Sequence, residues 1–449
     1  MSRVTPISGF PEFLPADRIV EQQFLDTIRQ TFELHGFASI ETRAVEPIDR
    51  LSNQGEDADK EIYAVRRLGS ASGDDDGPGL GLHFDLTVPF ARYVLENSGK
   101  LVFPFRRYQI QKVWRGERPQ DGRYREFTQA DIDIVGDGTL PFHYEVELPL
   151  VIAEAFQKLP IPPFRIQVNN RKIPEGFYRG LGIEDVASVL RIVDKLDKIG
   201  PDDVAAALIA AGLTDAQAKA ALQLAEIATT DASFVERVRA LGVEHETLDE
   251  GLEQLAAVMT AANEHAPGLL VADLKIARGL DYYTGTVYET QLIGHESYGS
   301  ICSGGRYDAL ASDGKTTYPG VGISIGVSRL LARLTGLGLV KASRTTPTAV
   351  LVALTDEESR ADAMRTAALL RQRGIPTEVA PAAAKFGKQI RFADRRGIPF
   401  VWFSGSADGT VQDTVKDIRS GDQTPADPAS WVPPEEDRLP RIETTQENS

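Results

Sequence analysis

The spacing of apolar residues along the chain predicts a mixture of helices and strands. An apolar side chain recurs every four positions early in the sequence, at Val20, Phe24, Ile28 and Phe32. This spacing is typical of an amphipathic helix, which we expect over residues 18–34. The helix should end at Gly36, because glycine tolerates the left-handed backbone found at helix ends.

Residues 106–136 predict an antiparallel hairpin in which two apolar strands flank a polar loop at 116–122. In the second strand, Asp131 and Asp133 alternate with isoleucines, so both should lie on one face of the strand. The hairpin tip and its flanks carry Arg115, Arg118, Arg123 and Arg125. A charged loop is usually only solvated, but four neighbouring guanidiniums repel one another unless they share a polyanion. Because arginine binds phosphate oxygens in pairs, the pattern favours a polyphosphate site.

Changes in residue composition and in the spacing of apolar residues divide the rest of the chain into segments. The segment from Asp85 through Thr87 is expected to start as a strand, with Pro89 then opening a helix. Residues 172–265 are rich in alanine and leucine, with repeated helix signals, which predicts a helical module inserted between strands. Sequence typical of β-strands returns after this module and continues through residues 266–340.

The C-terminal part predicts a small α/β domain over 345–425, because strands there alternate with helices. A basic helix is expected at 385–396, followed by a strand at 400–403. The tail, residues 426–449, is rich in proline and charge, and we expect it to be disordered.

Composition excludes several classes of protein. The chain has 449 residues, one cysteine (Cys302) and a formal net charge of −16, so a disulfide framework and indiscriminate nucleic-acid binding are both disfavoured. No apolar run approaches the ~18–20 residues that cross a bilayer, so no membrane partner is expected. We therefore expect a cytoplasmic protein, with any nucleic acid bound through local basic patches.

Phosphate must be bound by side chains rather than by a glycine loop. The sequence contains neither GxxxxGK[ST] nor GxGxxG. The candidates are Arg115 with the neighbouring loop arginines, Arg278 in ARGLDYYTG and Arg329 in GISIGVSRL. Any one of these arginines alone would be read as an ordinary ion-pair partner. Together they predict a reaction driven by positioning and charge neutralisation.

Several motifs resemble those of the histidyl-tRNA synthetases, a family of class II aminoacyl-tRNA synthetases. WRGERPQDGRYREFTQADIDIVG resembles motif 2, GVGISIGVSRL resembles motif 3, and HGFASIETRAVEP resembles the dimer-forming motif 1. ARGLDYYTGTVYE and CSGGRYD resemble two signatures peculiar to the histidine enzymes. The resemblance covers nearly the whole chain. It implies an α+β catalytic domain built on an antiparallel sheet flanked by helices (1–171 and 266–340), a helical insertion and a C-terminal α/β anticodon-binding domain.

The resemblance also implies a role for each matching residue in binding L-histidine. Asp85, Thr87 and Gln129 would hold the α-amino group. Asp133 with Tyr282 and Tyr283 would line the imidazole pocket. A ligand lacking those hydrogen-bonding groups would be rejected by a factor of about 10⁴ or more, so no editing domain is expected.

For ATP, the family's pattern assigns the arginines and their neighbours. Arg115 would bind the α-phosphate and the substrate carboxylate, and Arg278 would stabilise the pentacoordinate phosphorus, so both also count among the histidine-binding residues. Arg329 would lie along the adenine and γ-phosphate, with Arg123 and Glu117 helping to hold ATP. Catalysis would rest on Arg115, Arg278 and Gln129. Mg²⁺ is expected with ATP through ligands that the sequence does not name, and no bound organic cofactor is expected.

The chain departs from the family's pattern in places. Arg43 stands where motif 1 usually has a proline that packs at the dimer interface. His83 and Phe84 stand where many relatives have Leu-Arg, and HFDLTVPFAR resembles the archaeal and eukaryotic branch. In the C-terminal domain, a basic helical face suits the phosphates and loop bases of tRNA(His), although it could equally be only solvated. Its residues are Lys385, Lys388, Arg391 and Arg395, followed by Arg396.

The expected activity is that of an ATP-dependent, AMP-forming histidine–tRNA ligase acting as a homodimer. The principal alternative is a non-catalytic paralogue, the histidine-sensing regulatory subunit of ATP phosphoribosyltransferase. That paralogue lacks the anticodon domain and usually loses the ATP arginines. This sequence has both the domain and the arginines. A more remote alternative is an RNA-binding protein that uses only the C-terminal domain.

Overall fold

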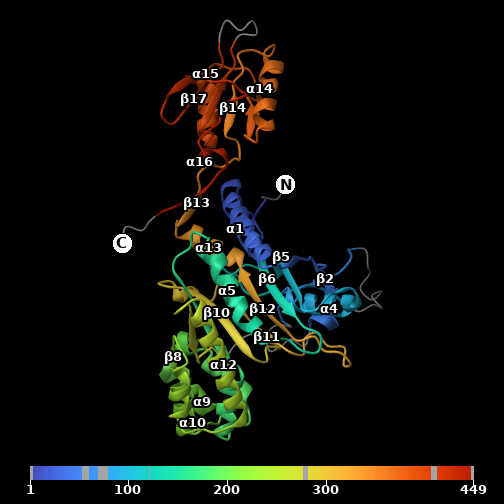
Figure 1. Cartoon of the computed structure of the whole chain (residues 1–449), viewed down its shortest axis with the longest axis vertical. Helices are drawn as coiled ribbons and strands as arrows, with labels where there is room; N and C mark the ends of the chain where they lie inside the picture. Colours follow the sequence, from blue (N-terminus) through green and yellow to red (C-terminus); the bar gives the residue numbers. More distant parts are fainter. Residues whose placement is uncertain are drawn as a thin grey trace. The chain divides into compact units, whose positions relative to one another are not determined.

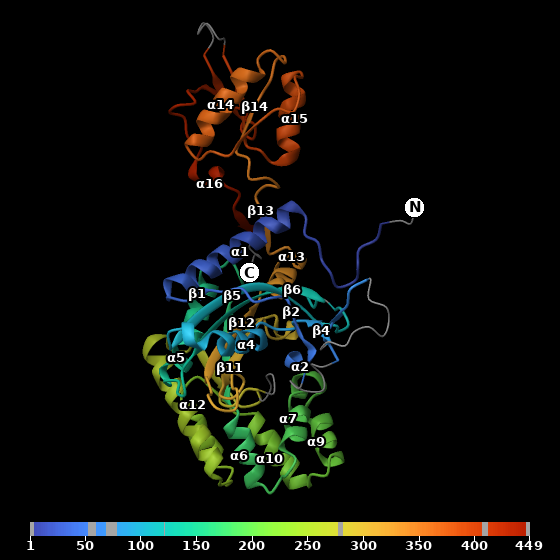
Figure 2. The same cartoon turned by 90° about the vertical axis from the view of Figure 1, so that its right-hand side faces the viewer.

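The computed structural model describes most of the chain, namely residues 4–52, 60–68, 79–120, 122–276, 282–405 and 412–445. The chain divides into two units, residues 1–11 with 24–333 and residues 12–23 with 334–449. None of the helices in the described ranges combines the length and apolar character needed to cross a bilayer. Figures 1 and 2 show the elements of each unit.

The first unit is built on a mixed nine-stranded sheet (Figure 1). In spatial order, the strands are β1 (Ala38–Ser39), β5 (Phe105–Trp114), β6 (Glu126–Val135), β12 (Gly320–Gly326), β11 (Cys302–Tyr307), β10 (Thr286–Leu292), β7 (Phe164–Asn170), β9 (Leu270–Asp273) and β8 (Ala228–Thr229). The pairs β1–β5 and β7–β9 are parallel, and the other neighbours are antiparallel. A three-stranded sheet stands apart, formed by β2 (Val45–Pro47), β4 (Leu80–Leu82) and β3 (Ala64–Val65).

Helices flank the nine-stranded sheet, as the family resemblance implied. They are α1 (Pro15–Leu34), α4 (Thr87–Asn97), α5 (His143–Gln157) and α13 (Val327–Gly336), with short 3-10 turns η1 (Ser98–Lys100) and η2 (Glu296–Tyr298). Helix α2 (Ile48–Leu51) packs against β2 and β4 of the three-stranded sheet. The four apolar residues expected to form a stripe on α1 are all buried, and Gly36 has a φ of 76° just after the helix. The expected amphipathic helix is therefore confirmed.

Helix α5 lies against one face of the sheet and is fixed there by Glu145. This buried carboxylate accepts hydrogen bonds from Thr286 Oγ1 at 2.5 Å and from Arg306 Nη1 at 2.7 Å. Because side chains alternate along a strand, Tyr307 points to the opposite face, where its hydroxyl reaches Asp133. The face of the sheet opposite α5 is thus the one that carries the polar residues of β6.

Seven helices form the module between β7 and β9 (Figure 2). They are α6 (Lys172–Gly180), α7 (Val186–Val193), α8 (Leu196–Ile199), α9 (Pro201–Ala210), α10 (Asp215–Ala225), α11 (Phe234–Arg239) and α12 (Glu246–His265). Helices α6 and α12 cross closely, since a Cβ at Gly176 would stand 2.2 Å from the Leu248 nitrogen. The run of helices is interrupted by β8, which pairs with β9, so this segment contributes an edge strand to the sheet.

The second unit contains the predicted α/β fold. Its five-stranded sheet has the order β15 (Thr377–Val379), β14 (Val350–Val352), β16 (Phe400–Phe403), β17 (Thr414–Asp417) and β18 (Gln423–Pro425). Helices α14 (Arg360–Gln372) and α15 (Phe386–Arg396) connect the parallel strands, and the fully buried Trp402 belongs to the core. Strand β13 (Val340–Ala342) pairs with β19 (Ile442–Thr444), and α16 spans Glu435–Arg438.

The expectation of a disordered tail is wrong for residues 426–445. Trp431 packs edge-on against the rings of Phe400 and Trp402, at centroid distances of 5.3 and 5.6 Å. Farther along, the buried Asp437 accepts two hydrogen bonds of 2.7 Å from Arg419. Proline and charge suggested disorder, but one tryptophan and one buried aspartate paired with an arginine anchor this segment.

Candidate active site

Strands β5, β6 and β12 place three polar rows side by side on the face opposite α5. The register aligns Arg107, Gln109 and Gln111 of β5 with Asp133, Asp131 and Gln129 of β6, and these with Gly322, Ser324 and Gly326 of β12. The alternation of aspartate with isoleucine in the sequence predicted the middle row. Small residues in β12 leave room above it, so the rows can form the floor of a site.

Three buried aspartates gather on this floor, and we call Asp85, Asp131 and Asp133 the acidic cluster. Burial raises the pKa of Asp85 and of Asp133 to about 6, and that of Asp131 to about 7. Nearby cations oppose the effect of burial, chiefly Arg107 for Asp131 and Asp133, and Arg115 for Asp85. Such a cluster is poised to receive a ligand that brings positive charge.

Asp133 is held from two sides. Arg107 contacts its Oδ2 at 2.6 Å, and the hydroxyl of Tyr307 donates to its Oδ1 at 2.7 Å. Gly322 faces the same carboxylate, and a Cβ there would lie 2.0 Å from Oδ1. The glycine is therefore required by close approach, and the carboxylate cannot turn away from its position.

Asp85 and Tyr282 are joined across the site. The Tyr282 hydroxyl donates to Asp85 Oδ2 at 3.2 Å, and the other oxygen of Asp85 accepts the Val88 amide at 3.1 Å. The expectation that Asp85 and Thr87 start a strand is wrong, because α4 already begins at Thr87, two residues before Pro89. The carboxylate caps the start of that helix, which local sequence pattern did not distinguish from a strand.

The two predicted tyrosines lie together. Their rings meet edge to face with centroids 4.8 Å apart, and burial raises the pKa of both phenols. Tyr283 also borders Gly305, where a Cβ would stand 2.9 Å from its ring. Neutral phenols beside Asp85 and Asp133 offer hydrogen-bond donors and acceptors of the kind that an imidazole ring requires.

Next to these residues is a cavity of about 210 Å³, which we call the arginine pocket. It is lined by Arg115, Glu117, Gly122, Arg123, Tyr124, Phe127, Gln129, Ser300, Ile301, Cys302, Ser303, Ser324, Gly326 and Arg329. Three arginines against one glutamate make its lining cationic. Five predicted site residues, from β6, α13 and the hairpin loop, therefore share one cavity.

The guanidiniums of the pocket are positioned by the surrounding backbone. Arg115 Nε donates to the Phe84 carbonyl at 3.0 Å, and its guanidinium lies 5.1 Å from the Phe127 ring centroid. Arg329 donates to the Tyr298 carbonyl at 2.5 Å, while its buried Nε meets no acceptor among the described residues. Burial and the charge of Arg123 lower the pKa of Arg329. An anion bound between these guanidiniums would accept a hydrogen bond from Arg329 Nε and would offset the repulsion between Arg329 and Arg123.

Arg278 lies outside the described residues, so its predicted place beside Arg115 and Arg329 stays a prediction. Sequence reasoning did not select Arg107, Asp131, Ser324 or Tyr307 as site residues, although all four line or support this site. The period-2 pattern through Gln129 could have indicated Asp131. The other three required knowledge of which strands pair.

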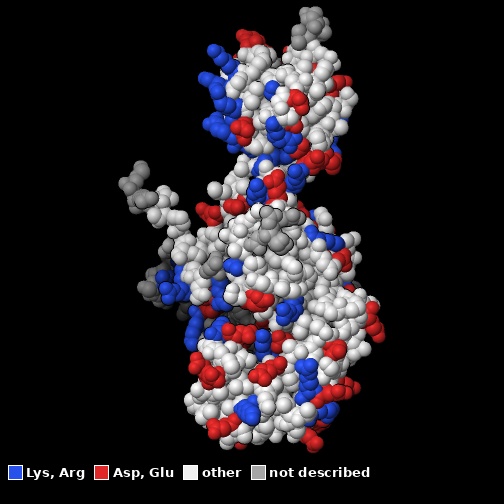
Figure 3. Space-filling model, turned by 90° about the vertical axis from the view of Figure 1, so that its left-hand side faces the viewer, with Lys and Arg blue, Asp and Glu red and all other residues white. Residues whose placement is uncertain are grey.

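A second candidate surface is on α15 in the other unit. Lys385, Lys388, Arg391 and Arg395 are exposed there, whereas Arg396 forms an internal ion pair with Glu378 at 2.6 Å. Figure 3 shows lysine and arginine side chains gathered along one side of this unit. The exposed four are available to an anionic partner, and Arg396 has a structural role.

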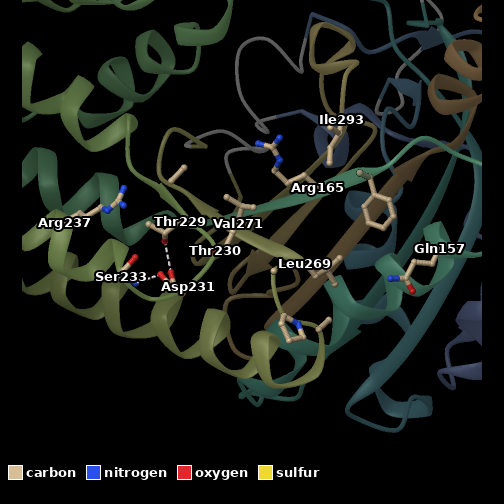
Figure 4. A pocket seen from close by; sticks show the side chains of 15 residues that line it. Gln157, Arg165, Thr229, Thr230, Asp231, Ser233, Arg237, Leu269, Val271 and Ile293 are labelled. Atoms are coloured by element: carbon tan, nitrogen blue, oxygen red, sulfur yellow. Dashed lines mark hydrogen bonds between the residues drawn. The ribbon is translucent and has the colours of Figure 1, made fainter. Parts of the chain in front are cut away.

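A larger cavity of about 900 Å³ lies elsewhere in the first unit, between the helical module and the sheet (Figure 4). Its lining includes Arg165, Arg237, Thr229 and Leu269. Thr229 Oγ1 donates to the Asp231 carbonyl at 2.7 Å, so the hydroxyl proton of this lining residue is already used within the protein. None of the predicted site residues lines this cavity, so it is distinct from the arginine pocket.

Two protein-family models match the chain, and together they cover most of both units. The family model described as histidyl-tRNA synthetase matches residues 9–330, which include the arginine pocket and the acidic cluster. The chain belongs to the histidyl-tRNA synthetase family. A second model, described as an anticodon binding domain, matches residues 348–430. The first matched region contains the nine-stranded sheet and the second contains the five-stranded α/β sheet, so the predicted fold class is confirmed.

Individual relatives agree. A protein of Micrococcus luteus named histidine–tRNA ligase is 62% identical, with 100% of each chain covered. The crystal structure of histidyl-tRNA synthetase from Nostoc sp. PCC 7120 is 36% identical with a TM-score of 0.84, covering 95% of this chain and 97% of that chain. A Bacillus halodurans structure described as an ATP phosphoribosyltransferase regulatory subunit/histidyl-tRNA synthetase has a TM-score of 0.71, covering 86% of this chain and 96% of that chain. At 19% identity it shows a shared fold alone.

Proposed function

We propose that this histidyl-tRNA synthetase attaches L-histidine to tRNA(His) in two steps that consume ATP. In the first, a histidine carboxylate oxygen attacks the α-phosphorus, giving histidyl-adenylate and pyrophosphate. In the second, a ribose hydroxyl of the terminal adenosine attacks the adenylate carbonyl, releasing AMP. The observation that carries the proposal is one cavity that joins Arg115, Arg123 and Arg329, beside a buried acidic cluster.

The two halves of the site have opposite charge, and this matches the two substrates. Arg115 and Arg329 would neutralise the triphosphate, and each charge-assisted hydrogen bond would stabilise phosphate charge by about 1.5–3 kcal/mol. We place Arg278 with them, at the α-phosphorus. Because Arg115 also acts on Asp85, it stands at the junction where the histidine carboxylate meets the phosphate.

Histidine would bind across the acidic cluster. Asp85, Thr87 and Gln129 would take the ammonium group. Asp133 and Tyr283 would take the imidazole nitrogens, with Tyr282 fixing Asp85. A side chain that lacked either ring nitrogen would leave one of these buried groups unpaired, and this provides the discrimination.

Mg²⁺ is expected to enter with ATP. Two carboxylates suit it, because Glu117 lines the arginine pocket and Glu289 acts on the charge of Arg329. Mg²⁺ characteristically uses one or two carboxylates together with substrate phosphates and water. It would neutralise triphosphate charge. The described residues include no cluster of three or more side chains arranged to hold a metal by themselves.

The exposed basic face of α15 would contact tRNA phosphates and loop bases. We further propose that the protein is a homodimer, as the resemblance of residues 35–47 to motif 1 implies, and that it works in the cytoplasm, as its composition favours. In this structure, the unusual Arg43 pairs with Glu46 at 3.0 Å and with Glu96 at 3.7 Å. Arg43 therefore takes part in an ion network within its own chain.

The test is charging of a tRNA(His) transcript by the full-length protein with radiolabelled histidine and ATP. We expect histidyl-tRNA and AMP to form together, and Arg278→Ala to slow adenylate formation by at least about 10²-fold. The alternative regulatory role would give histidine binding without AMP. A mild effect of Arg278→Ala with histidine binding intact would show that this arginine is misplaced.

A further inference from the structure

A chain of hydrogen bonds connects Gln129 to a residue that does not line the arginine pocket. Gln129 Nε2 donates to Ser324 Oγ at 2.9 Å, and Ser324 Oγ donates to Asp131 Oδ1 at 2.5 Å. The other end of the amide, Gln129 Oε1, is buried, and none of the described residues donates to it. This buried carbonyl oxygen is therefore an acceptor left for a ligand.

The direction of this chain follows from the chemistry of its members. The Ser324 hydroxyl donates its single proton to Asp131, which can only accept when it is ionised, above its raised pKa of about 7. The remaining lone pairs of Ser324 can only accept, so the group facing them must be the amide NH₂ of Gln129. The carbonyl of Gln129 must then point the other way. The orientation of the amide is thus set by Asp131, two strand positions away.

We propose that Asp131 and Ser324 are positioning residues that fix the carbonyl of Gln129 toward the α-ammonium group of the substrate. The inference rests on the proposed function, since it assumes that Gln129 meets that ammonium. Asp131 is assigned this role because its Oδ1 accepts the Ser324 hydroxyl, and Ser324 and Gln129 line the pocket whereas Asp131 does not. With the amide reversed, its NH₂ would face the ammonium and repel it.

The surroundings keep this arrangement in place. Asp131 and Ser324 are direct cross-strand partners in the β6–β12 register, and Gln129 stands opposite Gly326 in the same ladder. Burial raises the pKa of Asp131 to about 7 and the positive charge of Arg107 opposes this rise, so above that pH Asp131 is ionised and can only accept. Both strands belong to the central sheet, so the geometry exists before substrate arrives.

The decisive variant is Ser324→Ala, which removes the hydroxyl but keeps the negative charge of Asp131. Binding should be measured by calorimetry on the full-length protein with three probes. L-histidine has both ammonium and carboxylate, histidinol keeps the ammonium, and 3-(imidazol-4-yl)propionate keeps the carboxylate but has no ammonium. We expect Ser324→Ala to weaken histidine and histidinol about 5- to 10-fold, as for one hydrogen bond lost, and the propionate less than about twofold. Ser324→Thr, which restores a hydroxyl, should recover most of the affinity.

A matched variant, Gln129→Ala, separates this inference from the proposed function. If Gln129→Ala weakens histidine while Ser324→Ala does not, or Ser324→Ala weakens all three probes alike, the positioning role is refuted and the ammonium contact stands. If Gln129→Ala leaves histidine affinity unchanged, the proposed ammonium contact fails, and the positioning role fails with it. A rise in the KM for ATP of Ser324→Ala as large as its loss of histidine affinity would also refute the positioning role, because Ser324 would then act on the arginine pocket that it lines.

Discussion

The strongest structural test of the site replaces Arg107 with methionine. Arg107 is 0% exposed and contacts Asp133 Oδ2 at 2.6 Å, with its guanidinium 4.3 Å from the ring centroid of Phe90. Methionine fills similar volume but leaves the carboxylate of Asp133 buried without its cation. Breaking a buried ion pair by removing one partner typically destabilises a protein by about 3–5 kcal/mol.

The size of the loss should depend on pH. In the wild-type protein Asp133 is ionised at about pH 8, because burial raises its pKa only to about 6, so the ion pair with Arg107 is fully formed at that pH. Removing Arg107 raises that pKa further, because the cation no longer opposes burial. Protonation then relieves the penalty as the pH falls, and the loss should shrink toward about pH 5.

The assay is hydrogen exchange of the β5 and β6 backbone amides, which reports the free energy of opening in this part of the sheet. Arg106→Met, one position away, is the matched control. Its partner Glu147 is partly exposed, and the contact is 2.5 Å, so we expect a loss of about 1 kcal/mol. The double variant Arg107→Met with Asp133→Asn should recover stability without recovering histidine binding. Equal losses for Arg107→Met and Arg106→Met would refute the reasoning.

Three further outcomes are expected. Gly322→Ala should raise the KM for histidine at least about tenfold, because its Cβ would clash with Asp133, with little change in the KM for ATP. The KM for histidine should rise as the pH falls from about 7 to about 5, since Asp85 and Asp133 have pKa values of about 6 and protonated carboxyls no longer attract the positive charge of the substrate. Replacing Lys388 or Arg391 by alanine should weaken tRNA binding and lower its salt slope by about 1, while adenylate formation is unchanged.

Each of these three predictions has a control measurement on the same protein or on a matched variant. Gly336→Ala, where a Cβ meets nothing within 4 Å, should leave both KM values unchanged. The KM for ATP is the reference for the pH series, and a parallel rise of both constants would contradict an effect confined to the acidic cluster. Arg396→Ala should reduce stability but not the salt slope, because Arg396 is paired with Glu378.

Local pattern was enough to predict much of the fold. The stripe from Val20 to Phe32 is buried, and the hairpin β5–β6 spans the residues expected from its apolar alternation. These features depend on side-chain periodicity within one element. The family motifs then identified Arg115 and Arg329, which the structure brings into one cavity although they lie far apart in the chain.

What could not be predicted depends on contacts between distant segments. Arg107 is opposite Asp133 only because β5 and β6 pair in one register, and Ser324 meets Asp131 only because β12 joins them. The tail was misjudged for a similar reason. Its composition is that of a disordered segment, but Trp431 finds an aromatic surface made by β16.

The central claim is that an anion pocket and an imidazole pocket together activate histidine with ATP. Its most direct test is ATP–pyrophosphate exchange by the full-length protein, run with each of the twenty amino acids in turn. We expect exchange with histidine alone, and its loss in Arg115→Ala. Exchange that was absent with histidine, or equally strong with other amino acids, would contradict the account.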